Sequence, residues 1–227
     1  MKIPVAYLAV LLIWSTTPLG IVWSSETINP TMAVLLRMVI AVILGSLIIF
    51  ISKIDLPWHK EAIRLYSFSA LGIFGGMSFS YLAAGYLSSG ILSLAFGLAP
   101  AFSAILARRI LAEPKISMVR KLSMLLSFIG LALVCADNFS LKGDSIYGLI
   151  FILIAVFLFS LSGVLVKSIS LAIHPLSTTV GALIVSLPLF IVNWLLIDGS
   201  LDFSNWQLKS IWATIYLGVF GSLIGFF

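Results

Sequence analysis

Leu71-Gly72-Ile73-Phe74-Gly75 lies inside one hydrophobic segment and returns, 146 residues later, as Leu217-Gly218-Val219-Phe220-Gly221 inside another. The first hydrophobic segment of the chain returns at nearly the same offset. Trp14-Ser15 aligns with Phe159-Ser160, and Asn29-Pro30 aligns with His174-Pro175. Self-similarity at a fixed spacing predicts that the two halves of the chain share one structural pattern.

The composition identifies the solvent around this fold as a lipid bilayer. Hydrophobic residues make up 61% of the chain and charged residues 9%, and the mean hydropathy is +1.21. Soluble domains are about half apolar and about a quarter charged, so no soluble core could absorb this much apolar surface. The single cysteine, Cys135, excludes a disulfide within the chain and a thiolate metal cluster.

Eight hydrophobic segments are long enough to cross the hydrocarbon as helices, which takes about 20 residues. None alternates polar and apolar residues as a barrel strand does, so the sequence predicts an all-α polytopic membrane protein. The first segment is too long for the core of a signal peptide, and we interpret it as a retained membrane helix. The expected spans are about 4–24, 32–52, 63–86, 90–111, 118–137, 147–167, 175–197 and 208–227.

The basic residues predict the orientation of these spans. With the N-terminus in the cytoplasm, ten of the 13 lysines and arginines fall on the inner side, and only Lys142 and Lys209 fall on the outer side. Arg37 lies within a span. Membrane proteins keep an excess of lysine and arginine in their cytoplasmic loops. We therefore expect a multi-pass protein of a bacterial-type inner membrane with a cytoplasmic N-terminus.

The repeat and the orientation together predict the domain organisation. A unit of five helices is odd, so a second unit must sit inverted relative to the first. Residues 1–136 form the first repeat, residues 137–146 an outer linker, and residues 147–227 the second repeat with about three helices. At the repeat offset, the counterpart of the segment 89–136 would lie beyond Phe227. We therefore expect an inverted-repeat fold of ten helices, of which this sequence supplies about eight, with the rest C-terminal.

Four stretches resemble the EamA-like, ten-helix branch of the drug/metabolite transporter superfamily. They are Ile13-Trp14-Ser15-Thr16-Thr17-Pro18, Leu35-Leu36-Arg37-Met38, the segment 92–107, and Glu113-Pro114. The resemblance covers the whole chain through the order and spacing of these stretches. It implies a secondary transporter with a central cavity that works by alternating access and exports small metabolites, amino acids or drugs.

Arg37 is the sharpest candidate for a substrate-binding residue. A charged side chain in the bilayer costs about 2.5–3.5 kcal/mol on insertion scales, so it needs water, a partner or a function. In the functional interpretation, Arg37 faces a cavity and holds a carboxylate or phosphate of the solute. In the alternative, it extends to the outer interface, because it lies about two turns from Asn29-Pro30. No acidic residue lies in the interior of a predicted span, since Asp137 is the last residue of the fifth.

A polar patch in the first span is the second candidate. Its hydroxyl groups can satisfy the carbonyl that Pro18 leaves without a hydrogen bond. The patch lines the cavity in one interpretation and forms a packed helix kink in the other. The matching stretch in the second copy keeps an aromatic and a hydroxyl residue. Tyr81 in the third span is a further candidate. In addition to Arg37, the candidate cavity residues are therefore Trp14, Ser15, Thr16, Tyr81, Phe159 and Ser160.

Small residues at four-residue spacing predict close helix packing. They occur in the fourth span at Ser89, Ser93, Gly97 and Ala101, and in the third at Gly72 and Gly76. We interpret these residues, with Pro18 and Pro100, as packing and hinge positions. Pro100 is expected to interrupt the fourth span near its middle.

The remaining motifs exclude several other functions. The sequence has no metal-ligand spacing, no Gly-rich phosphate loop and no basic stripe for nucleic acid, so we expect no cofactor and no nucleic-acid partner. The expected partners are a small solute and the lipid bilayer. Two alternatives stay open: a non-transporting truncated protein or assembly subunit, and a membrane-embedded enzyme of lipid metabolism. The sequence identifies no catalytic constellation for such an enzyme.

Overall fold

The computed structural model describes residues 3–114, 117–139, 145–201 and 203–225, with only the backbone for residues 3–7, 9 and 134–139. Every element in these ranges is a helix, and each of the eight predicted spans is present. The helices are α1 (Ile3–Ser24), α2 (Pro30–Ser52), α3 (Lys60–Leu71), η1 (Gly72–Gly76), α4 (Met77–Ala84), α5 (Ser89–Phe96), α6 (Ala99–Ile110), α7 (Met118–Phe139), α8 (Ser145–Lys167), α9 (Pro175–Ile197), α10 (Leu208–Tyr216) and η2 (Leu217–Ile224).

Helix length and composition support the membrane assignment. Within the ranges that the structure describes, the segments Pro30–Ser52, Lys60–Ala84, Ser89–Ile110, Ser145–Lys167 and Pro175–Ile197 are long and apolar enough to cross a membrane. Val10–Ser24 and Leu208–Ile224 are shorter apolar helices. The chain is therefore an all-α polytopic membrane protein.

Some of the sequence predictions fall on residues that the structure leaves out. The predicted linker 137–146 overlaps the end of α7 and the start of α8, and its centre, 140–144, lies outside the described residues. The same is true of several charges used to predict the orientation, namely Lys2, Lys115, Lys142, Asp144 and Asp202.

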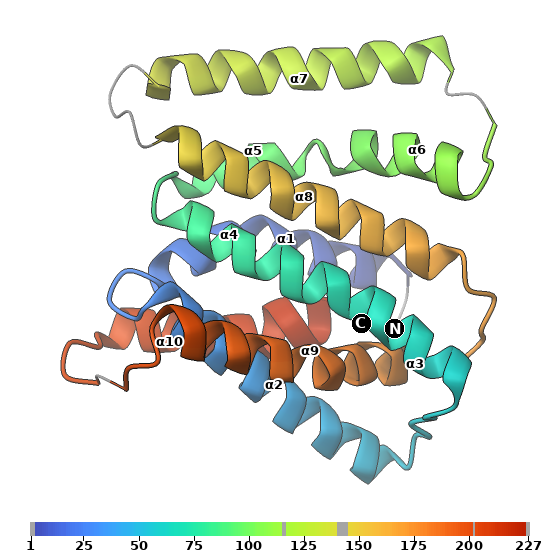
Figure 1. Ribbon diagram of the computed structural model, residues 1–227, viewed down its shortest axis with the longest axis vertical. Coiled ribbons are helices and arrows are strands. Elements are labelled where there is room, and N and C mark those ends of the chain that lie inside the picture. Colours follow the sequence, from blue (N-terminus) through green and yellow to red (C-terminus); the bar gives the residue numbers. More distant parts are fainter. Residues whose placement is uncertain (1–2, 115–116, 140–144, 202, 226–227) are drawn as a thin grey trace.

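The helices run side by side in a stack, with α7 at one edge and α2 at the opposite edge (Figure 1). Helix α8 lies at the centre, where it packs against α6 on one side and against α3, η1 and α4 on the other. Helix α9 packs against α2 and α3, and α1 packs against α5, α10 and η2. The two halves of the chain are therefore interleaved, not separate bodies.

The packing follows a two-fold pattern. Segment α3–η1–α4 packs on α8 and α9, and segment α10–η2 packs on their repeat counterparts, α1 and α2. Helices α2 and α9 pack on each other. Their starts also match, because Asn29 accepts a hydrogen bond from the Thr31 amide at 3.0 Å and His174 accepts one from the Leu176 amide at 3.2 Å. Two inverted units related by an axis between α2 and α9 would have this arrangement.

Both copies of the repeated glycine stretch adopt the same unusual structure. Gly72–Gly76 and Leu217–Ile224 are π-helical turns within otherwise α-helical segments. Such turns are rare and are frequently found at functional sites. A methyl group on Gly72 would lie 2.5 Å from the Ser162 Oγ, and one on Gly218 would lie 2.8 Å from the Ile40 Cγ2. These glycines therefore allow each π-helical turn to lie close to a neighbouring helix.

The fourth span is broken, which corrects the prediction of a packing ridge along it. Helix α5 ends at Phe96 with Gly97 as its cap, and α6 begins at Ala99, with Pro100 in its first turn. The break therefore precedes Pro100. Ser93 and Gly97 are exposed, and a methyl group on Gly97 would meet only Leu94 of its own helix. The buried face of α5 is formed by Ile91, Leu92 and Ala95.

Helix α1 continues through Pro18 without a break. Pro18 has no amide hydrogen for the carbonyl four residues before it, but the neighbouring hydroxyls bond to other carbonyls, which lie earlier in the helix. Thr17 donates to the Ile13 carbonyl at 2.7 Å, and Ser15 donates to the Leu12 carbonyl at 3.0 Å. Proline would have bonded to the carbonyl of Trp14, four residues before it. Hydroxyls on a helix reach the carbonyls three or four residues back, which explains the difference.

The glycine contacts generate a stability prediction. Gly72→Ala and Gly218→Ala each place a methyl group inside van der Waals distance of another helix, so each is expected to destabilise the fold by about 1–3 kcal/mol. Gly163→Ala is the matched control, because a methyl group there meets nothing within 4 Å. Thermal unfolding of the purified protein in detergent measures all three. Equal unfolding temperatures for Gly72→Ala and Gly163→Ala would contradict the close packing.

Candidate functional site

Arg37 is completely buried, so its side chain does not extend to the outer interface. Its Nε donates a hydrogen bond to the Ser222 Oγ of η2 at 2.6 Å. Neither Nη atom has a hydrogen-bond partner among the residues that the structure describes. The Tyr81 hydroxyl interacts electrostatically with the guanidinium. A buried charge with unsatisfied donors is costly, so this position is the main candidate for a functional site.

Arg37 lines a cavity of about 320 Å³ that we call the Arg37 chamber. Its walls come from six spans: α1, α2, the junction of η1 and α4, the break between α5 and α6, α8 and η2. The residues of α1 that face it, Trp14, Thr17, Pro18 and Ile21, are spaced as one face of a helix. A chamber of this size accommodates a small metabolite.

A second cavity, the Ala182 chamber, has a volume of about 250 Å³ and lies between α3, η1, α8 and α9. Its lining repeats that of the Arg37 chamber at an offset of 145 residues. Trp14, Thr17, Pro18, Ile21 and Arg37 correspond, in the same order, to Phe159, Ser162, Gly163, Val166 and Ala182. The two chambers are therefore counterparts in the repeat, and the cation is present in only one of them.

Phe159 lines both chambers and contacts its own repeat counterpart. Its ring lies edge-to-face against Trp14, with centroids 6.1 Å apart, and against Phe96, with centroids 6.0 Å apart. The Trp14 Nε1 donates to the Gly225 carbonyl at 3.1 Å. Two inverted repeats would bring equivalent residues into contact at their pseudo-two-fold axis.

The structure brings together four of the seven predicted cavity residues: Arg37, Trp14, Ser15 and Phe159 line the Arg37 chamber. The other three do not line it, although Tyr81 interacts with the Arg37 guanidinium. Thr16 is hydrogen-bonded to the Tyr216 hydroxyl at 2.6 Å, and Ser160 donates to the Ala99 carbonyl at 3.2 Å. Tyr81 is buried between α2 and α9 and accepts a hydrogen bond from the Ser24 Oγ at 3.2 Å.

Several lining residues were not predicted. Pro18 and Ser93 were assigned to hinges and packing, yet both line the Arg37 chamber. The helical face of α1 could have been found from the repeat itself, because its positions align with the lining of the second chamber. Residues from distant segments carry no such signal. These are Met77, Ser80, Leu92, Phe96, Ala99 and Gly221.

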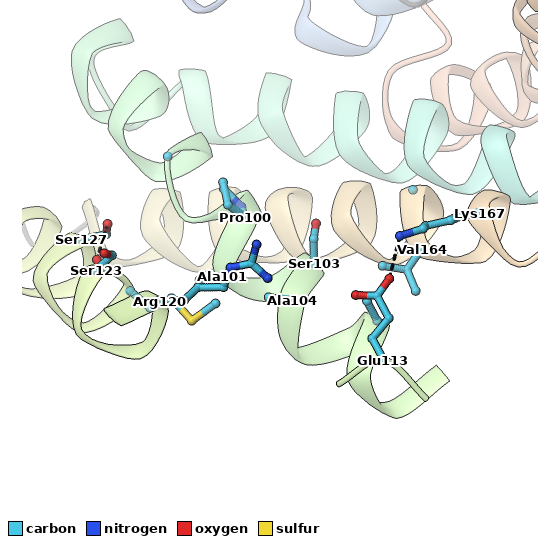
Figure 2. A pocket seen from close by; sticks show the side chains of 14 residues that line it. Pro100, Ala101, Ser103, Ala104, Glu113, Arg120, Ser123, Ser127, Val164 and Lys167 are labelled. Carbon is cyan, nitrogen blue, oxygen red and sulfur yellow. Dashed lines mark hydrogen bonds and ion pairs between the residues drawn. The ribbon is translucent and has the colours of Figure 1, made fainter. Parts of the chain in front are cut away.

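A third hollow, of about 520 Å³, lies between α6, α7 and α8 (Figure 2). Lys167 of α8 points to Glu113, and the two form an ion pair of 2.6 Å between partly exposed side chains. Arg120 of α7 is exposed. These charges lie at helix ends, where the membrane interface is expected, and one cation is already paired. The hollow therefore lacks the buried, unpaired group that marks the Arg37 chamber.

Comparison with known proteins agrees with the membrane fold. Residues 1–136 match the EamA-like transporter family. This chain belongs to that family. The matched region has the bounds predicted for the first repeat. The chain is also 26% identical, over 217 residues, to an uncharacterized transporter of Archaeoglobus fulgidus, and the alignment covers 94% of this chain and 74% of the relative. Family and relative point to a membrane transporter and not to an enzyme.

The contact between Trp14 and Phe159 generates a prediction for this EamA-like protein. Trp14→Leu and Phe159→Leu remove the same edge-to-face contact, which is worth about 0.5–1.5 kcal/mol beyond burial. The double variant is therefore expected to be less destabilised than the sum of the two single variants by that amount. Unfolding in detergent measures the cycle. Trp14→Leu with Phe157→Leu is the control pair, and additivity of both pairs would contradict the contact.

Proposed function

We propose that the protein is a secondary transporter that exports small organic solutes across a bacterial-type inner membrane by alternating access. Its N-terminus lies in the cytoplasm. The observation that carries the proposal is the pair of repeat-related chambers with Phe159 between them. With the predicted orientation, the Arg37 chamber lies toward the outer face and the Ala182 chamber toward the inner face.

Alternating access needs one solute site that communicates with either face in turn. Two chambers related by the repeat supply the two routes, since exchange of the conformations of the repeats would exchange which chamber is open. The contact between Trp14 and Phe159 lies between the two chambers. A change in their packing would connect the solute to one chamber or to the other.

The breaks in the helices supply the places where such a change can occur. The turns η1 and η2 and the break at Gly97 each border the Arg37 chamber or the Ala182 chamber. Gly97 itself lines the hollow between α6, α7 and α8. Its neighbours Phe96 and Ala99 line the Arg37 chamber. Interrupted helices beside a solute site are typical of secondary transporters, because free backbone groups are tolerated only where they line a cavity.

Solute efflux from intact cells tests the transport proposal. Cells that produce the full protein, as encoded in its own organism, are fed an isotopically labelled mixture of metabolites, and the medium is analysed by mass spectrometry. At least one solute is expected to appear faster than in cells with an empty vector. Ser93→Trp fills the Arg37 chamber and is expected to return efflux to background. Leu94→Trp is the matched control, because Leu94 is exposed and lines no chamber. No solute above background would refute the proposal.

Thiol labelling tests the alternating access and the orientation together. In a Cys135→Ser background, Ser93→Cys reports on the Arg37 chamber and Ser69→Cys on the Ala182 chamber. An impermeant maleimide is expected to reach Ser93→Cys from outside intact cells and Ser69→Cys only in inside-out vesicles. A transported solute should shift the two labelling rates in opposite directions. Labelling of both positions from one face would exclude this mechanism, and exchanged faces would reverse the orientation.

A further inference from the structure

The Arg37 guanidinium is buried at the wall of the chamber, where it is held along one edge and has no hydrogen-bond partner at the other. The hydrogen bond from Nε to Ser222 fixes one edge of the planar group. The two Nη atoms form the opposite edge and have no hydrogen-bond partner within the described ranges. Paired Nη donors match the two oxygens of a carboxylate, which such a fork binds with two parallel hydrogen bonds.

Gly221 makes room for this group. A methyl group at Gly221 would lie 3.1 Å from Nη2 of Arg37 and 3.5 Å from Oγ1 of Thr17. Any side chain there would therefore crowd the guanidinium. Gly221 belongs to the repeated stretch 217–221, so the same π-helical turn supplies both the space for the fork and, through Ser222, the hydrogen bond that orients it.

Among the residues that the structure describes, no aspartate or glutamate lines the Arg37 chamber to balance this charge. Glu26, near the end of α1, is exposed and paired with Lys209 at 2.8 Å. Because an isolated charge is costly away from water, the chamber favours an anion as its occupant.

The other polar groups in the chamber offer little to a second charge. The hydroxyls of Ser15, Thr17, Ser80 and Ser93 all donate to backbone carbonyls of their own helices. Trp14, Phe96 and Phe159 supply aromatic walls. An ammonium group would find no carboxylate here, whereas an apolar or aromatic body would be well accommodated.

We propose that the transported solute is a small organic monocarboxylate with an apolar or aromatic body. Its carboxylate accepts hydrogen bonds from both Nη atoms of Arg37, and its body lies against Trp14, Phe96 and Phe159. The inference rests on the proposed transport function and names its substrate class. It places neutral solutes and zwitterions, in which an ammonium group accompanies the carboxylate, among the poor substrates.

Three probes of one shape test the charge requirement. They are 3-phenylpropionate, its neutral amide 3-phenylpropanamide, and the zwitterion phenylalanine, with 4-methylvalerate as an aliphatic carboxylate. Calorimetric titration of the purified full-length protein is expected to show binding of the two carboxylates. The affinity for the amide and for the zwitterion is expected to be lower by about tenfold or more. Equal binding of the amide, or no binding of either carboxylate, would overturn the proposal.

Variants of the fork test the assigned residue. Arg37→Gln is expected to abolish the preference for 3-phenylpropionate over the amide. Arg37→Lys retains the charge without the paired donors and should retain only part of that preference. Arg120→Gln removes an exposed arginine outside the chamber and is the matched control. An unchanged preference in Arg37→Gln would overturn the proposal.

Ser222→Ala tests the same binding site without changing Arg37, in case the Arg37 variants do not fold. It leaves the guanidinium in place but removes the hydrogen bond that orients it, so carboxylate binding should weaken while amide binding stays the same. The binding and efflux measurements distinguish failure of this inference from failure of the transport proposal. Carboxylate binding without efflux would contradict the transport proposal alone. Efflux of neutral or zwitterionic solutes that Arg37→Gln leaves unchanged would overturn this inference alone.

Discussion

The close approach of the two glycine-rich π-helical turns to neighbouring helices is the constraint on which the rest of the structure depends. In a bilayer, helices gain nothing from hiding apolar surface from one another, so close packing decides how they associate. Gly72 brings η1 against α8, and Gly218 brings η2 against α2. These contacts join each half of the chain to the other. They also set the walls of the two chambers, because η2 borders the Arg37 chamber and η1 borders the Ala182 chamber.

The sequence predicted the spans well because each is a long apolar run, and length alone identifies a membrane helix. It placed the break of the fourth span at Pro100, whereas the structure has it at Gly97. It did not predict the π-helical turns. These depend on how closely a neighbouring helix approaches, as Ser162 approaches Gly72, and a single segment carries no record of its neighbour. The ridge from Ser89 to Ala101 was wrong for the same reason: the spacing was right, but α5 presents another face to its neighbours.

The candidate site was predicted where charge or the repeat marked it. Arg37 was recognisable as a cation among apolar residues, and Trp14 and Phe159 as aligned aromatics, and all three line the Arg37 chamber. Tyr81 and Ser160 had the right chemistry but lie on other helix faces. Gly221 and Ser222 were missed because their importance comes from a contact with Arg37, which lies 185 residues from Ser222 along the chain. Such a pairing appears only when the chain is folded.

The replacement of Arg37 by Ala182 at the equivalent position has a kinetic consequence. A carrier with two identical chambers would bind its solute equally well from either face. In the proposed carrier the cation is present in one chamber only, so the half-saturation concentrations on the two faces of the membrane should differ. For passive movement, detailed balance requires the ratio of maximal rate to half-saturation concentration to be the same in both directions. The face with the tighter site must therefore also have the lower maximal rate, and a scaffold built from two similar halves becomes a carrier with two unlike sides.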